Sequence, residues 1–324
     1  MTSRPLQEIQ VWFYLPAVGL GVGLGVGLEP DVPDWLILTP LALLLYATFV
    51  QVPLTRLPGA VLEGRFMAAA GLGNFFLIPA AVWALSWLVP PEPAILLGLY
   101  MVLLVPCTDW FIVFSHLGRG DAKLAIASTP LLLLTQFVLL PLYLWLFMGE
   151  TFAEVIRAGP FLQVFMLLIG LPLVAAALTQ RFSARHERAA RMVGWLEWLP
   201  VPALAIVLML IAAAHAGEAI HHVWGLERIV VVFALYPIVA AAIGIAMTRQ
   251  LHLSAAAGRT LTFSLGTRNS FVVLPFVLAL PDGWEMAGTV VVLQPLVELL
   301  AMLGYLRILP RCNWLEPPQG NVRD

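Results

Sequence analysis

Charged side chains are scarce in this chain of 324 residues. Asp, Glu, Lys and Arg make up 11% of it, whereas hydrophobic residues make up 61%. A soluble domain carries roughly 25% charged residues, so the chain has too little charged surface to form one. A formal net charge of −2 also offers no basic surface for nucleic acid, so we expect no nucleic-acid partner. The composition favours an all-α polytopic protein surrounded by the lipid bilayer.

Cysteine and catalytic motifs are also sparse. The two cysteines, Cys107 and Cys312, lie in very different contexts and make a poor disulfide pair, which disfavours a disulfide scaffold. The sequence has no His-Glu-x-x-His, nucleophile-elbow or Walker pattern. We therefore expect neither an enzyme nor a cofactor, and the same lack of a paired catalytic constellation disfavours an intramembrane enzyme.

Long hydrophobic runs fill almost the whole sequence. A bilayer core needs about 20 apolar residues per helix, and ten segments satisfy this requirement. They are residues 9–28, 34–53, 65–89, 94–116, 123–148, 159–180, 198–216, 228–248, 256–280 and 285–307. The first segment lacks a small-residue cleavage pattern, so we interpret it as a retained helix.

Basic residues are distributed unevenly between the connecting loops. Loops on the N-terminal side carry 14 of the 17 Lys and Arg residues: Arg4, Arg56, Arg65, Arg119, Lys123, Arg181, Arg185, Arg188, Arg191, Arg249, Arg259, Arg307, Arg311 and Arg323. The opposite loops carry only Arg157 and Arg228. The positive-inside rule predicts a multi-pass protein of the cell (inner) membrane with both termini in the cytoplasm.

Weak internal repeats indicate two inverted halves. Four motifs recur in the same order at offsets of 156 to 165 residues: 15–18 with 171–174, 35–40 with 195–200, 108–113 with 268–273, and 129–132 with 294–297. Five helices per repeat would invert the second copy, as in many secondary transporters. We predict a first repeat plus a sixth helix in 1–180, an interfacial linker helix in 181–197, the rest of the second repeat in 198–309 and a cytoplasmic tail in 310–324.

Two segments are interrupted at matching places in the repeats. The fourth segment is broken at 106–109 and the ninth at 266–270. Pro removes a backbone donor and Gly relaxes the chain, so both helices should unwind there and cross. Broken helices in matching repeat positions indicate a substrate site. The candidate binding residues are Cys107, Thr108, Asp109, Arg268, Asn269 and Ser270.

Three ionisable residues lie at membrane depth, where charge is unfavourable. Asp109 and Arg268 could pair across the crossing, either as part of the substrate site or as an architectural ion pair. Glu298 lies inside the tenth segment. It is a candidate proton carrier, and the alternative is a hydrogen-bonded Glu with no role in transport.

Cys107 combines a thiol with an unusual position. Buried cysteines are usually small hydrophobic residues. This one follows Pro106, precedes two polar residues and should lie near Arg268, and such surroundings favour the thiolate. A thiolate binds soft, thiophilic species.

These motifs resemble the arsenite permeases of the bile-acid/sodium symporter superfamily. In the fourth-helix signature of those permeases, as in 107–121, a Cys is followed fourteen residues later by the Asp of a Gly-Asp pair. Residues 295–298 resemble their tenth-helix motif, and 268–270 the ninth-helix crossover of the wider superfamily. The resemblance implies ten helices, with a core domain (segments 3–5 and 8–10) moving against a panel domain (1, 2, 6 and 7). It also implies export of trivalent arsenic or antimony with proton exchange, Cys107 as metalloid ligand and Glu298 as proton-linked acid.

Two departures from the sodium-coupled relatives bear on the coupling ion. Where those relatives have Glu and Gln oxygens, this chain has Ser264 and Arg268. A fixed cation repels sodium, so we expect sodium-independent transport. The alternative function is transport of a small organic anion held by Arg268, with the thiol incidental.

A glycine pattern in the first segment concerns helix packing. Gly19, Gly23 and Gly27 should allow close helix packing, either within the panel or across a homodimer.

Overall fold

The computed structural model describes residues 4–28, 32–51, 64–108, 110–158, 166–196, 198–221, 223–278, 280–281 and 283–311. Over these residues the regular structure is helical, and the β-pairing is one isolated bridge between Pro106 and Arg268. The prediction of an all-helical chain is therefore confirmed.

Five helical stretches of the described chain are long and apolar enough to cross a membrane. They are Gly64–Ser86, Ala122–Met148, Val193–Ala214, Leu226–Gln250 and Glu285–Arg311. Shorter apolar helices cover Pro16–Leu28, Trp35–Gln51 and Pro93–Leu103. The fourth and ninth predicted segments are divided into halves that are each too short to span, and residues 159–165 lie outside the described ranges. Ten spans therefore remain a prediction.

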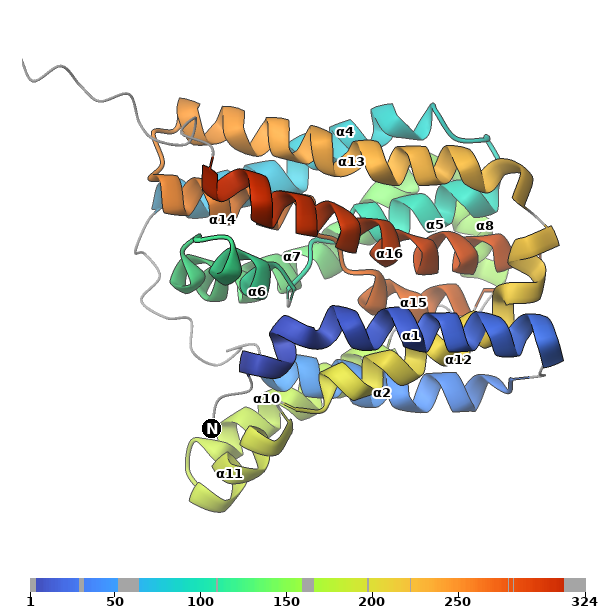
Figure 1. Cartoon of the computed structure of the whole chain (residues 1–324), viewed down its shortest axis with the longest axis horizontal. Coiled ribbons are helices and arrows are strands. Elements are labelled where there is room, and N and C mark those ends of the chain that lie inside the picture. Colours follow the sequence, from blue (N-terminus) through green and yellow to red (C-terminus); the bar gives the residue numbers. More distant parts are fainter. Residues whose placement is uncertain are drawn as a thin grey trace, which may run out of the picture.

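The long helices lie roughly parallel or antiparallel in two sets (Figure 1). In one set, α1 (Arg4–Leu28) packs on α12 (Pro200–His221), and α2 (Asp34–Gln51) packs on α10 (Leu171–Ser183) and α12. In the other, α13 (Val223–Gln250) packs on α14 (Ala255–Gly266), and α16 (Glu285–Ile308) packs on α5 (Pro93–Leu103), α13 and α15 (Ser270–Leu278). The second set contains both broken helices.

The contact between α1 and α12 depends on a glycine other than those expected. A Cβ at Gly21 would overlap the carbonyl of Met209, whereas Cβ atoms at Gly19, Gly23 and Gly27 would meet nothing within 4 Å. Close packing within the chain therefore uses Gly21. The three glycines of the predicted stripe face open space, where a second copy or lipid could contact them.

Several shorter elements connect the long helices. The stretch α3 (Gly64–Leu72), η2 (Gly73–Leu77) and α4 (Ile78–Ser86) is one continuous helix with a π-helical turn. The side chain of Asp121 caps the start of α7 (Ala122–Met148). The amphipathic helix α8 (Glu150–Ala158) was not anticipated from the sequence. The predicted linker contains α11 (Glu187–Leu196), which protrudes from the bundle (Figure 1).

The two broken segments cross through their unwound parts. The first break separates α5 from α6 (Trp110–Leu117), and the second separates α14 from α15. The N–H of Cys107 donates to the carbonyl of Thr267 (3.2 Å), and the N–H of Asn269 donates to that of Val105 (2.9 Å). Each break thus satisfies part of the other's backbone, which stabilises an otherwise unfavourable irregular chain inside the bundle.

Candidate functional site

The crossing places an ionised side chain in the interior of the bundle. Arg268 is 3% exposed, and its Nη2 donates to Oδ1 of Asn74 (2.8 Å) and to the carbonyls of Ser264 (2.9 Å) and Leu265 (2.8 Å). The ring of Tyr236 lies 5.5 Å from the guanidinium carbon, a favourable cation–π distance. Nε and Nη1 of Arg268 have no hydrogen-bond partner in the described part of the chain. The guanidinium therefore keeps donors available.

Asn74 is a site residue that the sequence analysis missed. It is fully buried in the π-helical turn Gly73–Leu77, and such turns are frequent at functional sites. Its Nδ2 donates to the carbonyl of Ala70 (3.0 Å) and to Oγ of Ser264 (3.0 Å). These bonds fix the amide so that its oxygen faces Arg268. A lone Asn in an otherwise apolar segment was the available signal.

Glu298 lies beside the crossing and contacts the backbone of Arg268. Its Oε2 accepts from the N–H of Arg268 (2.8 Å) and from Nε2 of Gln294 (2.5 Å). Gln294 in turn accepts at Oε1 from the hydroxyl of Ser270 (2.6 Å). Oε1 of Glu298 has no partner among the described residues. One oxygen of the carboxyl group is thus held within the crossing, and the other has no partner in the described ranges.

Thr108 and Asn269 complete the polar contacts of the crossing. Oδ1 of Asn269 accepts from the N–H of Val272 (3.2 Å) and caps α15, while its Nδ2 lies 3.4 Å from the hydroxyl of Thr108. That second distance is long for a hydrogen bond, so the Thr108 hydroxyl is weakly held. Asp109 lies outside the described residues, as does its predicted pairing with Arg268.

The thiol of Cys107 lies at the start of a half-helix. The side chain is 5% exposed, and Sγ accepts from the N–H of Trp110 (3.3 Å), the first residue of α6. A helix N-terminus favours negative charge on a group held there. No group of three metal-ligating side chains occurs in the described ranges, so Cys107 is not part of a multi-residue metal cluster there.

Aromatic rings connect this region to the other helix set. Trp110 stacks on Tyr14 of α1, with centroids 6.0 Å apart and planes at 10°. It also contacts Phe114 (6.1 Å) and Phe271 (6.0 Å). Trp110 therefore links the start of α6, next to Cys107, to α1.

All the predicted site residues except Asp109, which lies outside the described residues, converge in space. Hydrogen bonds or backbone pairing place Cys107, Thr108, Arg268, Asn269, Ser270 and Glu298 in one buried region at the crossing. Asn74, Tyr236 and Gln294 join them. The region combines a thiol, a guanidinium and a carboxylate with neutral hydrogen-bonding groups, which suits reversible binding of a small polar species.

Comparison with known proteins gives the family of this chain. Residues 38–222, more than half of the chain, match the Sodium Bile acid symporter family. The chain belongs to this family. Symporter-family membership together with the apolar helices makes it a multi-pass membrane protein of a transporter family. It is also similar to "Arsenical-resistance protein Acr3" of Corynebacterium glutamicum, at 19% identity over 294 residues, covering 86% of this chain and 78% of that protein. The resemblance found in the motifs is thus confirmed.

Proposed function

We propose that this protein is a secondary transporter that exports trivalent arsenic or antimony in exchange for protons. The observation that carries the proposal is the thiol of Cys107 at the start of α6, on the same crossing as Arg268 and Glu298. The similarity to a protein named for arsenical resistance supports the same substrate class. Soft metalloids prefer sulfur ligands, and Cys107 supplies one.

Binding and release are a reversible exchange at arsenic. Arsenous acid carries three hydroxyl groups. The Cys107 thiol displaces one of them, so that an S–As bond forms, an As–O bond breaks, and the hydroxyl leaves with the thiol proton as water. The reverse reaction with water restores the thiol and releases arsenous acid on the other side. Thr108 and Asn269, whose mutual bond is long, are free to hydrogen-bond one of the two remaining hydroxyls.

Glu298 is the proposed site of the exchanged proton. Its Oε2 accepts from the N–H of Arg268 within the crossing, and its Oε1 is unbonded among the described residues. Protonation weakens the acceptor strength of this carboxyl and so changes how firmly α16 holds the crossing. That contact links proton occupancy to the conformation of the substrate site.

The transport cycle requires two bodies that move against each other. We propose the ten-helix inverted-repeat arrangement, with α1, α2, α10 and α12 in the panel and the crossing in the core. Both termini face the cytoplasmic side of the cell (inner) membrane, in keeping with the basic loops. The stacked pair Tyr14–Trp110 spans the boundary between panel and core, so it must separate when that boundary opens.

Arg268 makes sodium coupling unnecessary. The oxygen of Asn74 and two carbonyls at the end of α14 surround its Nη2 at 2.8–2.9 Å. Oxygen clusters of this kind hold hard cations such as sodium. The tethered guanidinium takes that place, so transport proceeds without sodium.

A second candidate function is transport of a small organic anion. It is favoured by one observation, the two nitrogens of Arg268 without a partner in the described residues. A carboxylate could bind them in a bidentate manner. In this case Cys107 would have no role in transport.

Arsenite accumulation in an efflux-deficient bacterial host distinguishes arsenite export from organic-anion transport. Cells carrying the wild type should hold less arsenic than cells carrying Cys107→Ala, while Cys312→Ala should behave as wild type. If wild type and Cys107→Ala lower cellular arsenic equally, the thiol is not the ligand. If neither protein lowers it, the organic-anion function replaces arsenite export.

A further inference from the structure

Gln136 carries a buried carboxamide without a hydrogen-bond partner. The residue lies in the middle of α7 and is 2% exposed, and neither Nε2 nor Oε1 is bonded within the described residues. Ser128 and Thr129 on the same helix each bond to the carbonyl of Ala125. Buried polar atoms are nearly always bonded, and an unmet donor or acceptor destabilises the fold. We therefore expect the amide of Gln136 to hydrogen-bond a molecule that is not part of the chain.

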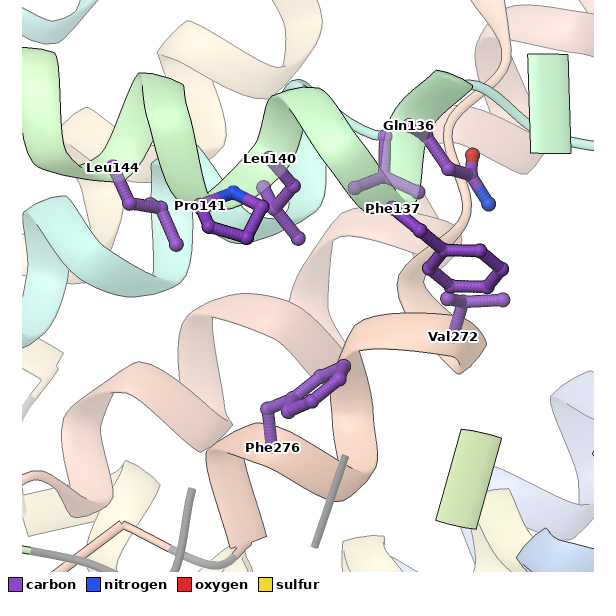
Figure 2. Close-up of a pocket in the computed structure, with 8 residues that line it drawn as sticks. Gln136, Phe137, Leu140, Pro141, Leu144, Val272 and Phe276 are labelled. Carbon is purple, nitrogen blue, oxygen red and sulfur yellow. The ribbon is translucent and has the colours of Figure 1, made fainter. Parts of the chain in front are cut away.

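A small cavity places Gln136 next to the crossing. The cavity has a volume of about 20 Å³ and an apolar wall that includes Phe137, Val105, Val272 and the carbon atoms of Gln136, whose amide group lies outside it. Val105 and Val272 are the residues whose backbones bond to Asn269. Figure 2 shows Gln136 and Val272 at one end of the lining, with the amide pointing away from Leu144 and Pro141. Gln136 thus approaches both crossing segments from α7.

We infer that the carboxamide of Gln136 hydrogen-bonds the transported molecule and selects substrates that carry hydroxyl groups. This inference rests on the proposed function. An amide offers both a donor and an acceptor, which matches a hydroxyl group in either role. Arsenous acid bound to Cys107 keeps two hydroxyls: Thr108 and Asn269 are available to one of them, and Gln136 bonds the other.

The cavity is too small for the substrate in the state described here. About 10–15 Å³ accommodates one water molecule, so this space of about 20 Å³ holds no more than that. Phe137, beside Gln136, contacts Phe49 of α2 edge-on, with centroids 6.4 Å apart and planes at 86°. Separation of α2 from α7 would release this ring and enlarge the space beside Gln136. The hydrogen bond between Gln136 and the substrate therefore forms only in the substrate-loaded stage of the cycle.

Transport by purified protein in proteoliposomes tests the inference with two substrates. One is arsenite and the other is methylarsenite, in which a methyl group replaces a hydroxyl. Gln136→Met keeps the length of the side chain and removes its hydrogen bonds. Loss of one neutral hydrogen bond is expected to raise the KM for arsenite about three- to tenfold with kcat unchanged. Methylarsenite should be affected less, so the preference for arsenite falls.

A matched variant and a stability measurement separate binding from folding. Leu140→Met changes another buried residue of the cavity wall and should leave the substrate preference unchanged. Gln136→Met should melt at the same or a higher temperature, because the variant no longer buries an unbonded amide. A lower melting temperature with equal loss for both substrates would show a structural role and overturn the inference.

Failure of the inference differs from failure of the proposed function. If the wild type transports arsenite and Gln136→Met shows the same KM and the same preference, only the inference fails. If the wild type transports neither arsenical, the proposed function fails and the role of Gln136 fails with it.

Discussion

Nη2 of Arg268 lies 2.8 Å from Oδ1 of Asn74, a residue 194 positions earlier in the chain. The bond joins the unwound end of α14 to the π-helical turn Gly73–Leu77. The same nitrogen also bonds the carbonyls of Ser264 and Leu265. The carbonyl of Leu265 also accepts from the hydroxyl of Tyr236 (2.7 Å), so Arg268 satisfies chiefly Oδ1 of Asn74 and the carbonyl of Ser264.

Replacement of Arg268 should create a dependence on sodium. In Arg268→Gln the neutral amide no longer repels a cation, and Oδ1 of Asn74 and the carbonyl of Ser264 lose their donor and become free to bind one. Transport by the wild type should be the same in sodium and choline buffers. The variant should be slower in choline, and sodium should restore part of its rate.

Arg259→Gln is the control for this experiment. Arg259 lies on α14, the helix that ends just before Arg268, and it bonds the carbonyl of Arg119 instead of Asn74. Its rate should not respond to sodium. A wild-type protein stimulated by sodium would contradict the proposed role of Arg268.

Replacement of Glu298 should uncouple transport from protons. Glu298→Gln retains an oxygen that can accept from the N–H of Arg268 but cannot exchange a proton. In proteoliposomes, an imposed pH gradient should drive arsenite accumulation by the wild type and not by the variant. Arsenite exchange at equal pH should persist in both.

Glu285→Gln provides a control on the same helix. Glu285 lies in the first turn of α16 and accepts from the N–H of Gly283 at the surface. This variant should respond to the gradient as the wild type does. Gradient-driven accumulation by Glu298→Gln would show that another group carries the proton.

Two glycines of α1 should respond oppositely to the same substitution. Gly21→Ala places a methyl group against the backbone of Met209 and should destabilise the protein by about 1–3 kcal/mol. Gly23→Ala meets nothing within 4 Å and should be neutral or stabilising by up to about 1 kcal/mol. Melting temperatures in detergent compare the two. Equal loss of stability would mean that Gly23 also lies in an interface, such as that of a dimer.

The crossing could be predicted from sequence because the causes of helix breakage are local. Pro106 lacks a backbone N–H, and Gly266 makes the backbone more flexible. Each is followed by polar residues, which are rare inside an apolar helix. The Pro106–Arg268 bridge lies where these signals meet. The bond from Arg268 to Asn74 could not be predicted, because nothing in the repeat pattern points to Asn74. The predicted pairing of Arg268 with Asp109 lies outside the described residues.

Other features could not be predicted from the sequence, because they depend on contacts between residues that are far apart in the chain. Gln136 is one polar residue in a long apolar helix, and its significance comes from its lack of a partner among the described residues. Helix α8 is short and amphipathic, so a search for apolar segments passes over it. The glycine pattern of α1 suggested Gly19, Gly23 and Gly27, but the rotation of α1 against α12 places Gly21 in the contact.

The most direct test of the proposed function is arsenite transport by a protein with a single thiol. Cys312→Ala leaves Cys107 as the only cysteine. This protein should transport arsenite into proteoliposomes at the wild-type rate, in exchange for protons that leave down an imposed gradient. Adding Cys107→Ser should lower the rate at least tenfold without a change in melting temperature, because a hydroxyl is a poor ligand for a soft metalloid. Equal rates with and without the Cys107 thiol would contradict thiol-based export.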